Sequence, residues 1–206
     1  MTRDEAARAI CEAGVYLASR GLTPGTSGNI SLRIDRGFLM TPTNASLAAL
    51  APADLAVLDP GGERNGGRQE TKERDLHLAV YRVRPQAEAI VHVHSTYAVA
   101  LACLRHPDPS DVLIPLTPYA VMRIGRLPLT RYAKPGSADL ARAVGERAGD
   151  AHAILLANHG PIVAAPTLAA AIAITEEIEE AAKLQLLLHG REVSRLEPAE
   201  VELLRA

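Results

Sequence analysis

Hydrophobic and polar residues alternate along this chain with two periods, one typical of helices and the other of strands. The pattern is clearest at 72–84, where Leu76, Ala79, Val80 and Val83 share one side of a predicted helix that Pro85 ends. At the N-terminus, Thr2 and Glu5 have the spacing of a capping box, which marks the start of a helix. The pattern predicts helices over 2–19, 72–84, 95–104, 137–148 and 167–189, and a last one from Pro198.

Shorter apolar runs between turn residues predict strands. The runs 30–34 and 38–42 flank Asp35–Gly37 and predict a hairpin, and a short strand from Leu55 is expected to enter an exposed loop. We also expect a buried strand at 89–94, two short strands with irregular connections within 111–132, and two strands around the turn at 158–161.

The order of these elements predicts an α/β fold. Strands and helices are interleaved, yet many strands are joined by hairpins, which favours a central, mostly antiparallel sheet flanked by helices over a doubly wound parallel one. No repeat, low-complexity linker or clear boundary divides the sequence. We therefore expect a single domain over 1–206.

Composition narrows the possible partners. Hydrophobic residues make up 48% of the 206 residues but aromatic ones only 3%, so the core must be aliphatic and stacking platforms for single-stranded nucleic acid are lacking. The net charge of −2, without a basic stripe, argues against nucleic acid and anionic membranes as partners. The acids near the N-terminus and the lack of a long apolar run predict neither a signal peptide nor a membrane span. We interpret Cys11 and Cys103 as buried thiols in a reducing cytoplasm.

Two histidines in the strand at 89–94 are the first candidates for chemistry. Because strand side chains alternate between faces, His92 and His94 point to one side while Val91 and Val93 point into the core. Buried imidazoles are costly unless they are hydrogen-bonded or bind a metal. The pair is therefore either two hydrogen-bonded core histidines or half of a metal site.

A third histidine favours the metal site. His159 follows an apolar strand and precedes a Gly–Pro turn that could aim its side chain at the edge of the sheet, although a histidine in a turn is also common. Three neutral imidazoles with an open fourth position are typical of catalytic zinc. We leave His77, His106, His152 and His189 as structural or surface residues, and interpret 176–180 as a solvated helix face with Lys183 supporting Glu179.

An acid and two turns could complete such a site. Glu73 lies near the start of the predicted helix at 72–84, where the helix dipole alone favours an acid, but it could also act as general acid/base beside a metal. Small and hydroxyl residues in turns could bind an anion through backbone N–H groups, although turn chemistry by itself explains most such clusters. The candidates are Thr26, Ser27, Gly28 and Asn29, with Thr43, Asn44, Thr71 and Lys72.

Several motifs in a fixed order resemble the class II aldolase/adducin family from about residue 5 to 190. They are G-T-S-G-N (25–29), T-P-T-x-x-S (41–46), an acid before L-H-x-A-x-Y (76–81), V-H-x-H-S (91–95) and A-N-H-G (157–160). The resemblance implies a three-layer fold with a mostly antiparallel sheet. It also implies a homotetramer with active sites at the subunit interfaces.

The resemblance assigns roles to the candidate residues. His92, His94 and His159 match zinc ligands for one Zn²⁺ per subunit, and Glu73 matches the acid/base that also ligates zinc when the site is empty. Thr26 to Asn29, Thr43 and Asn44 match the phosphate and substrate loops. Thr71 and Lys72 replace two serines of the sugar-phosphate aldolases, which suggests a substrate with extra negative charge. Tyr119 matches by spacing a tyrosine that reaches a neighbour's active site.

Two stretches, 70–82 and 115–136, are similar to a decarboxylase subfamily that acts on four-carbon acid sugars. This implies zinc-dependent decarboxylation of a 3-oxo-tetronate 4-phosphate to dihydroxyacetone phosphate and CO2 through an enediolate. Lys72, Arg123 and Arg126 are then candidates for the substrate carboxylate or phosphate. The alternatives are a sugar-phosphate aldolase of the fuculose or rhamnulose type, an epimerase, and a non-catalytic adducin-like module. The retained histidines and acid argue against the module.

Overall fold

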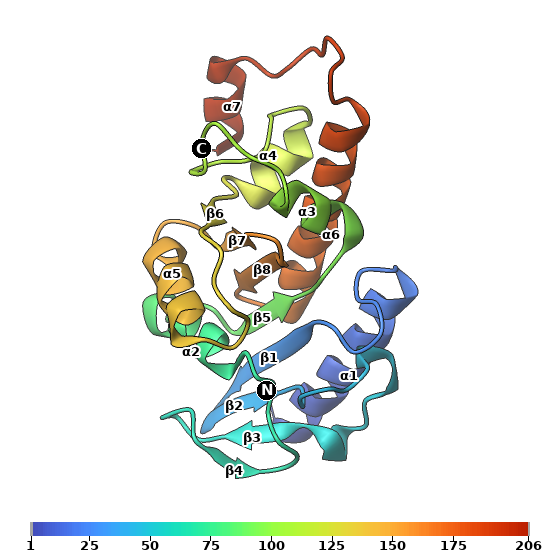
Figure 1. Ribbon diagram of the computed structural model, residues 1–206. Helices are drawn as coiled ribbons and strands as arrows, with labels where there is room; N and C mark the ends of the chain where they lie inside the picture. The colour runs from blue at the N-terminus through green and yellow to red at the C-terminus, as the bar shows by residue number, and fades with distance from the viewer. Residues whose placement is uncertain (1, 206) are drawn as a thin grey trace.

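Figure 1 shows the computed structural model, which describes residues 2–205, with one central sheet and helices packed on both of its faces. The sheet has eight strands in the order β4-β3-β2-β1-β5-β8-β7-β6. Neighbouring strands are antiparallel except for β6 and β7, which are parallel. The strands are β1 (Asn29–Ile34), β2 (Gly37–Met40), β3 (Ala56–Leu58), β4 (Arg64–Gly66), β5 (Ala89–His92), β6 (Leu129–Thr130), β7 (Ala153–Leu156) and β8 (Gly160–Ala165). The predicted mostly antiparallel fold is confirmed.

The helices begin where capping chemistry predicts. Thr2 and Glu5 form a capping box at the first helix, and the Ser137 and Thr167 side chains accept from Leu140 N and Ala170 N at two later ones. The helices are α1 (Arg3–Ser19), α2 (Arg74–Val83), α3 (Thr96–Ala102), α4 (Pro118–Ile124), α5 (Ala138–Ala148), α6 (Leu168–Leu187) and α7 (Pro198–Arg205), with short 3₁₀ turns at Leu47–Ala49 and Pro52–Asp54.

The side chains on the two faces of the sheet form two separate hydrophobic cores. Val91 of β5 packs in the core that α1, α3 and α6 cover, whereas its neighbour Ile90 packs in the core that α2 and α5 cover. Each fully buried aliphatic side chain of this size contributes about 1.5–3 kcal/mol to stability. This alternation gives the molecule three layers.

Three predictions from the sequence, in separate parts of the chain, were wrong. Of the two strands expected within 111–132, only β6 is present, and the segment before it forms α4. Thr117 caps α4 through Ala120 N, and Pro118 occupies its first turn, so the prolines start a helix instead of breaking strands. The loop expected after β3 contains an additional edge strand, β4. Cys11 is half-buried and Cys103 is exposed, so neither is the buried thiol that we expected.

The central strands meet at one end of the sheet, and this end positions the candidate site. His92 ends β5 and lies opposite Asn29, which begins β1, and opposite Ile162 near the start of β8. The N-terminus of α2 reaches the same end through Glu73. Within residues 2–205, no helix has both the length and the apolar character needed to cross a bilayer.

Candidate metal centre and active site

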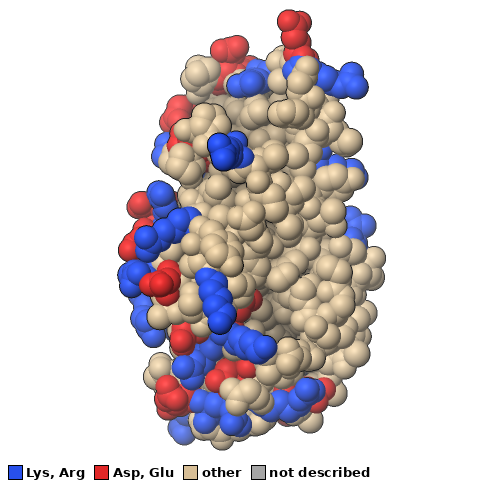
Figure 2. All heavy atoms as spheres, in the orientation of Figure 1, with Lys and Arg blue, Asp and Glu red and all other residues tan. Residues whose placement is uncertain are grey.

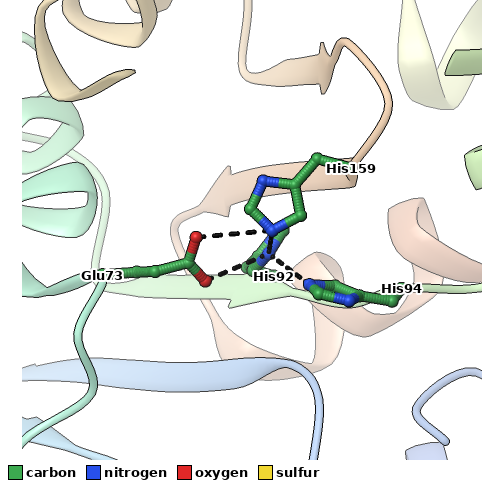
Figure 3. A group of neighbouring side chains, drawn as sticks. All are labelled: Glu73, His92, His94 and His159. Carbon is green, nitrogen blue, oxygen red and sulfur yellow. Dashed lines mark hydrogen bonds and ion pairs between the residues drawn. The ribbon is translucent and has the colours of Figure 1, made fainter. Parts of the chain in front are cut away.

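Four side chains from three separate stretches of the chain converge at this end of the sheet (Figure 3). One ligand atom from each of Glu73, His92, His94 and His159 lies within 4.8 Å of the other three. The His92 Nε2 is 3.0 Å from the His94 Nε2 and 3.3 Å from the His159 Nε2. The Glu73 carboxylate oxygens lie 3.2 Å from the His92 Nε2 and 3.4 Å from the His159 Nε2. This geometry leaves the imidazoles facing one common point.

Two glycines allow the backbone segments to approach closely enough for this convergence. A Cβ on Gly160 would lie 2.3 Å from the Val93 carbonyl oxygen, and a Cβ on Gly28 would lie 2.9 Å from the His92 carbonyl oxygen. Only glycine permits the first approach, which brings the turn carrying His159 onto the segment after β5. Gly28 also has a φ of 79°, which other residues rarely adopt.

The hydrogen bonding of His92 suits a metal ligand. Its Nδ1 donates to the Pro161 carbonyl oxygen over 2.8 Å, which orients the ring with its Nε2 towards the other three side chains. Burial lowers the pKa of His94 to about 4 and that of His159 to about 3, and the neighbouring His92 lowers both further. At neutral pH these two imidazoles therefore carry a lone pair for a cation.

The electrostatics of Glu73 also fit a cation at this point. Burial alone would raise the pKa of the Glu73 carboxyl, but His92, His159 and a hydrogen bond from Asn29 outweigh it and hold that pKa well below its usual range. Burial would likewise lower the pKa of His92, but the Glu73 carboxylate raises it. The Glu73 Oε1 is buried without a hydrogen-bond partner among residues 2–205. A set of three imidazoles and one carboxylate is typical of zinc and similar divalent ions.

A cavity of about 580 Å³ opens beside this group. Among the residues described in its lining, Lys72 is the one cation, and its side chain is exposed. The predicted site residues in the lining are Thr26, Ser27, Gly28, Asn29, Thr43, Asn44, Thr71, Lys72, Glu73, His94 and His159. Pro42, Thr96, Val99, Pro135 and Asn158 also line it and were not predicted. A cavity of this volume is large enough for a small-molecule ligand.

Hydrogen bonds within the two turns hold their shape at the cavity wall. The Thr23 hydroxyl donates to the Ser27 carbonyl oxygen over 2.5 Å, and the Ser27 hydroxyl donates to the Pro24 carbonyl oxygen over 2.7 Å. The Glu73 N–H donates to the Thr71 hydroxyl over 3.3 Å, which fixes the start of α2. Asn44 has a φ of 54°, a conformation that asparagine tolerates better than most residues.

Three predicted site residues, Tyr119, Arg123 and Arg126, lie outside both the cluster and this cavity. Tyr119 and Arg123 are on α4, where the Tyr119 side chain is 61% exposed and the Arg123 guanidinium lies 5.3 Å from its ring centroid. Arg123 also lies 3.6 Å from the Glu177 carboxylate. None of the three lines the cavity of its own chain.

The structure also gives a role to residues that we had placed elsewhere. Glu179, expected on a solvated face, accepts hydrogen bonds from Tyr97 N over 2.9 Å and Ala98 N over 2.8 Å, and so caps α3 just after His94. Lys183 lies 3.9 Å from Glu180 instead of pairing with Glu179. His77 is fully buried. A carboxylate in one helix that caps another gives no local sequence signal.

Comparisons with known proteins agree with this geometry. Residues 8–186 match the family model described as "Class II Aldolase and Adducin N-terminal domain". A 3-oxo-tetronate 4-phosphate decarboxylase of Haemophilus influenzae is 45% identical over 184 residues, covering 89% of this chain and 88% of the relative.

Solved structures extend the similarity. YgbL from Klebsiella pneumoniae, for which aldolase, epimerase and decarboxylase are given as alternatives, has a TM-score of 0.96 at 42% identity and covers 100% of both chains. An L-fuculose 1-phosphate aldolase has a TM-score of 0.89 at 32% identity, covering 99% of this chain and 96% of its own.

The chain belongs to the class II aldolase and adducin family. Within that family it is a metal-dependent carbon–carbon lyase, since its relatives are named as decarboxylases and aldolases and it has a cluster of histidines and a glutamate that could hold the metal.

Proposed function

We propose that this enzyme decarboxylates a 3-oxo-tetronate 4-phosphate to dihydroxyacetone phosphate and CO2 with Zn²⁺ as cofactor. The observation that carries the proposal is the convergence of three imidazoles and Glu73 beside a cavity with a single lining cation, Lys72. The 45% identity to a relative of that name supports the choice of substrate.

His92, His94 and His159 would hold the zinc, with Glu73 as a further ligand in the absence of substrate. When bound, the ion would accept the negative charge that develops on the substrate oxygens as the C–C bond breaks, which can contribute several kcal/mol. The residues themselves supply orientation: the His92 Nδ1 bond to Pro161 and the glycine contacts hold the imidazoles in place.

The proton balance defines the role of the acid/base. When the carboxylate leaves as CO2, its bonding electron pair remains on the carbon beside the ketone, and that carbon must gain one proton to give the product. Tyr119 of the partner subunit, or Glu73 after it has taken up a proton from solvent, donates this proton to the carbon. Positioned proton transfer of this kind contributes about 100–10,000-fold to rate.

The remaining lining residues would bind the two anionic groups of the substrate. The turn at Thr26–Asn29, with Thr43, Asn44 and Thr71, offers N–H and hydroxyl groups for the phosphate. Lys72 would neutralise the carboxylate or the phosphate, as would Arg123 across an interface. The carboxylate is the group that distinguishes the proposed substrate from a sugar phosphate, which is uncharged at that end.

We further propose a homotetramer with active sites at its subunit interfaces, acting in the cytoplasm as a single-domain chain. The exposure of Tyr119 and its distance from its own cavity support a site that two subunits complete. Two free cysteines suit a reducing compartment.

A direct assay tests the reaction. Purified protein with measured zinc content would be incubated with 3-oxo-tetronate 4-phosphate, and CO2 and dihydroxyacetone phosphate would be measured together. Equal amounts of both are expected. The second candidate is a sugar-phosphate aldolase, which the L-fuculose 1-phosphate aldolase structure at 32% identity favours. Release of an aldehyde from L-fuculose 1-phosphate, with no CO2 from the tetronate, would establish it instead.

A further inference from the structure

A continuous row of buried polar side chains leads away from Glu73 between α2 and β1. Glu73, His77 and Tyr81 are four residues apart and therefore lie on one side of the helix. Asn29 and Ser31 are two residues apart in β1 and therefore point to the same face of the sheet. His77 and Ser31 are fully buried, and the surrounding core under α2 and α5 is otherwise apolar.

Short hydrogen bonds link the members of this row one after another. The Asn29 Nδ2 donates to the Glu73 Oε2 over 2.9 Å, and the Asn29 Oδ1 lies 2.5 Å from the His77 Nε2. The His77 Nδ1 lies 2.7 Å from the Ser31 hydroxyl, which is 3.0 Å from the Tyr81 hydroxyl. Both ends of the Asn29 amide and both ring nitrogens of His77 are therefore used.

Chemistry fixes the direction of the bonds that run from Glu73 through Asn29 and His77 to Ser31. An ionised Glu73 carboxylate only accepts hydrogen bonds, so Asn29 must turn its NH2 group towards it. The Asn29 carbonyl oxygen then faces His77, whose Nε2 must carry the proton. The His77 Nδ1 is left as an acceptor, and the Ser31 hydroxyl donates to it.

We propose that His77 is a positioning residue that locks the Asn29 amide in the one orientation that donates to Glu73. The inference rests on the proposed function, because it assigns His77 a part in preparing Glu73 for its role as zinc ligand and acid/base. A reversed amide would place the Asn29 carbonyl oxygen 2.9 Å from a carboxylate oxygen, two acceptors in contact. His77 prevents the reversal, because a protonated Nε2 would then face the amide NH2.

The environment of His77 keeps its ring neutral, with one donor and one acceptor nitrogen. Burial, with the nearby His92, lowers the pKa of His77 to about 3, so the ring is neutral at working pH and carries a single proton. A doubly protonated ring would offer a donor to Ser31 as well and would remove the directionality. Partners of buried ligand side chains typically change metal affinity or activity by about 10–100-fold when they are removed.

The tautomer of His77 can be measured in the unaltered enzyme. Nitrogen-15 NMR of the histidine-labelled, zinc-loaded protein is expected to show a protonated Nε2 and an unprotonated Nδ1 for the ring that disappears in His77→Gln. A protonated Nδ1, alone or with Nε2, would overturn the proposal. This readout needs no substrate, so it distinguishes a failure here from a failure of the proposed reaction.

Variants then test the positioning itself. His77→Gln retains a donor near the Nε2 position, whereas His77→Leu has none. His77→Leu is expected to weaken zinc binding, measured by chelator competition, and to lower kcat by about 10–100-fold, with KM little changed. His77→Gln is expected to recover most of both. Equal losses in the two variants would show that His77 only fills space.

Tyr81→Phe is the matched control for stability. It removes the hydroxyl one turn further along α2, whose loss should lower the melting temperature without changing zinc affinity or kcat. A loss of zinc affinity in Tyr81→Phe as large as in His77→Leu would also contradict the proposal. If His77→Leu does not fold, the proposal is still tested by the tautomer of His77 and by the zinc affinity and kcat of His77→Gln compared with those of Tyr81→Phe.

Discussion

The two parts of the predicted active site differ in how they are held. The histidines and Glu73 lie at the end of the central strands, buried or half-buried, and are connected to β1, β8 and α2. Tyr119 and Arg123 lie on α4, exposed and outside the cavity of their own chain. The difference indicates that one subunit has all the side chains that could hold a metal, whereas acid and charge from α4 would need a neighbouring copy.

The largest expected effect on activity comes from removing a candidate metal ligand. His92→Ala should lose bound zinc and lower kcat/KM by about 1,000-fold or more, because the metal contributes several kcal/mol and each 1.36 kcal/mol is tenfold in rate. Metal analysis and the decarboxylase assay check this. His106→Ala is the control, since His106 donates to the Leu101 carbonyl oxygen away from the cavity and should leave both unchanged. Zinc retained at one per chain in His92→Ala would contradict the ligand assignment.

Glu73→Gln separates proton transfer from metal binding. We expect zinc content and melting temperature close to wild type but a kcat about 100–1,000-fold lower, because an amide cannot transfer the proton. Glu70→Gln is the matched control, because Glu70 is a nearby buried acid whose carboxylate lies 3.2 Å from Arg64. This substitution should change the stability of the protein but not kcat. Near-normal turnover in Glu73→Gln would remove Glu73 from its role.

Lys72→Met tests the charge at the cavity wall. Loss of a charge-assisted hydrogen bond, about 1.5–3 kcal/mol, should lower kcat/KM by about 10–100-fold, mostly through KM. Lys183→Met, beside Glu180, is the control and should behave as wild type. Steady-state kinetics over a range of salt concentrations provide the measurement. An unchanged KM would mean that Lys72 does not contact the substrate.

The smallest expected effect belongs to the exposed part. Tyr119→Phe removes one hydroxyl, worth about 0.5–1.5 kcal/mol if it bonds the substrate, and should lower kcat up to about tenfold. Mixing Tyr119→Phe with His92→Ala subunits should restore complete sites in about a quarter of positions if Tyr119 acts across an interface. Activity no greater than the sum of the separate variants would place Tyr119 outside the site.

Local patterns were sufficient to predict most of the fold and to nominate the metal residues. The alternation of His92 and His94 with two valines, and the turn after His159, are readable over a few residues. A helix forms after Thr117, where we expected a strand, because the Thr117 side chain caps it. An apolar run interrupted by prolines does not reveal such a side-chain hydrogen bond.

What could not be predicted depends on pairing between distant residues. The register that places Asn29 opposite His92 and the packing of α2 on β1 together create the row through His77, and no short motif encodes them. The cap that Glu179 provides to α3 is of the same kind, since its partners are about eighty residues away. For the same reason, sequence alone gave no basis to separate His77 from the surface histidines.

The glycines at 28 and 160 have a consequence for how the candidate ligand set tolerates substitution. Because both lie against the backbone of residues 92–93 at the limit of contact, main-chain atoms set how closely the segments that carry the candidate ligands approach one another. One added methyl group at position 160 would collide with the Val93 carbonyl oxygen and push the turn that carries His159 away from the segment after β5. The convergence of the candidate ligands therefore depends on two positions that carry no side chain.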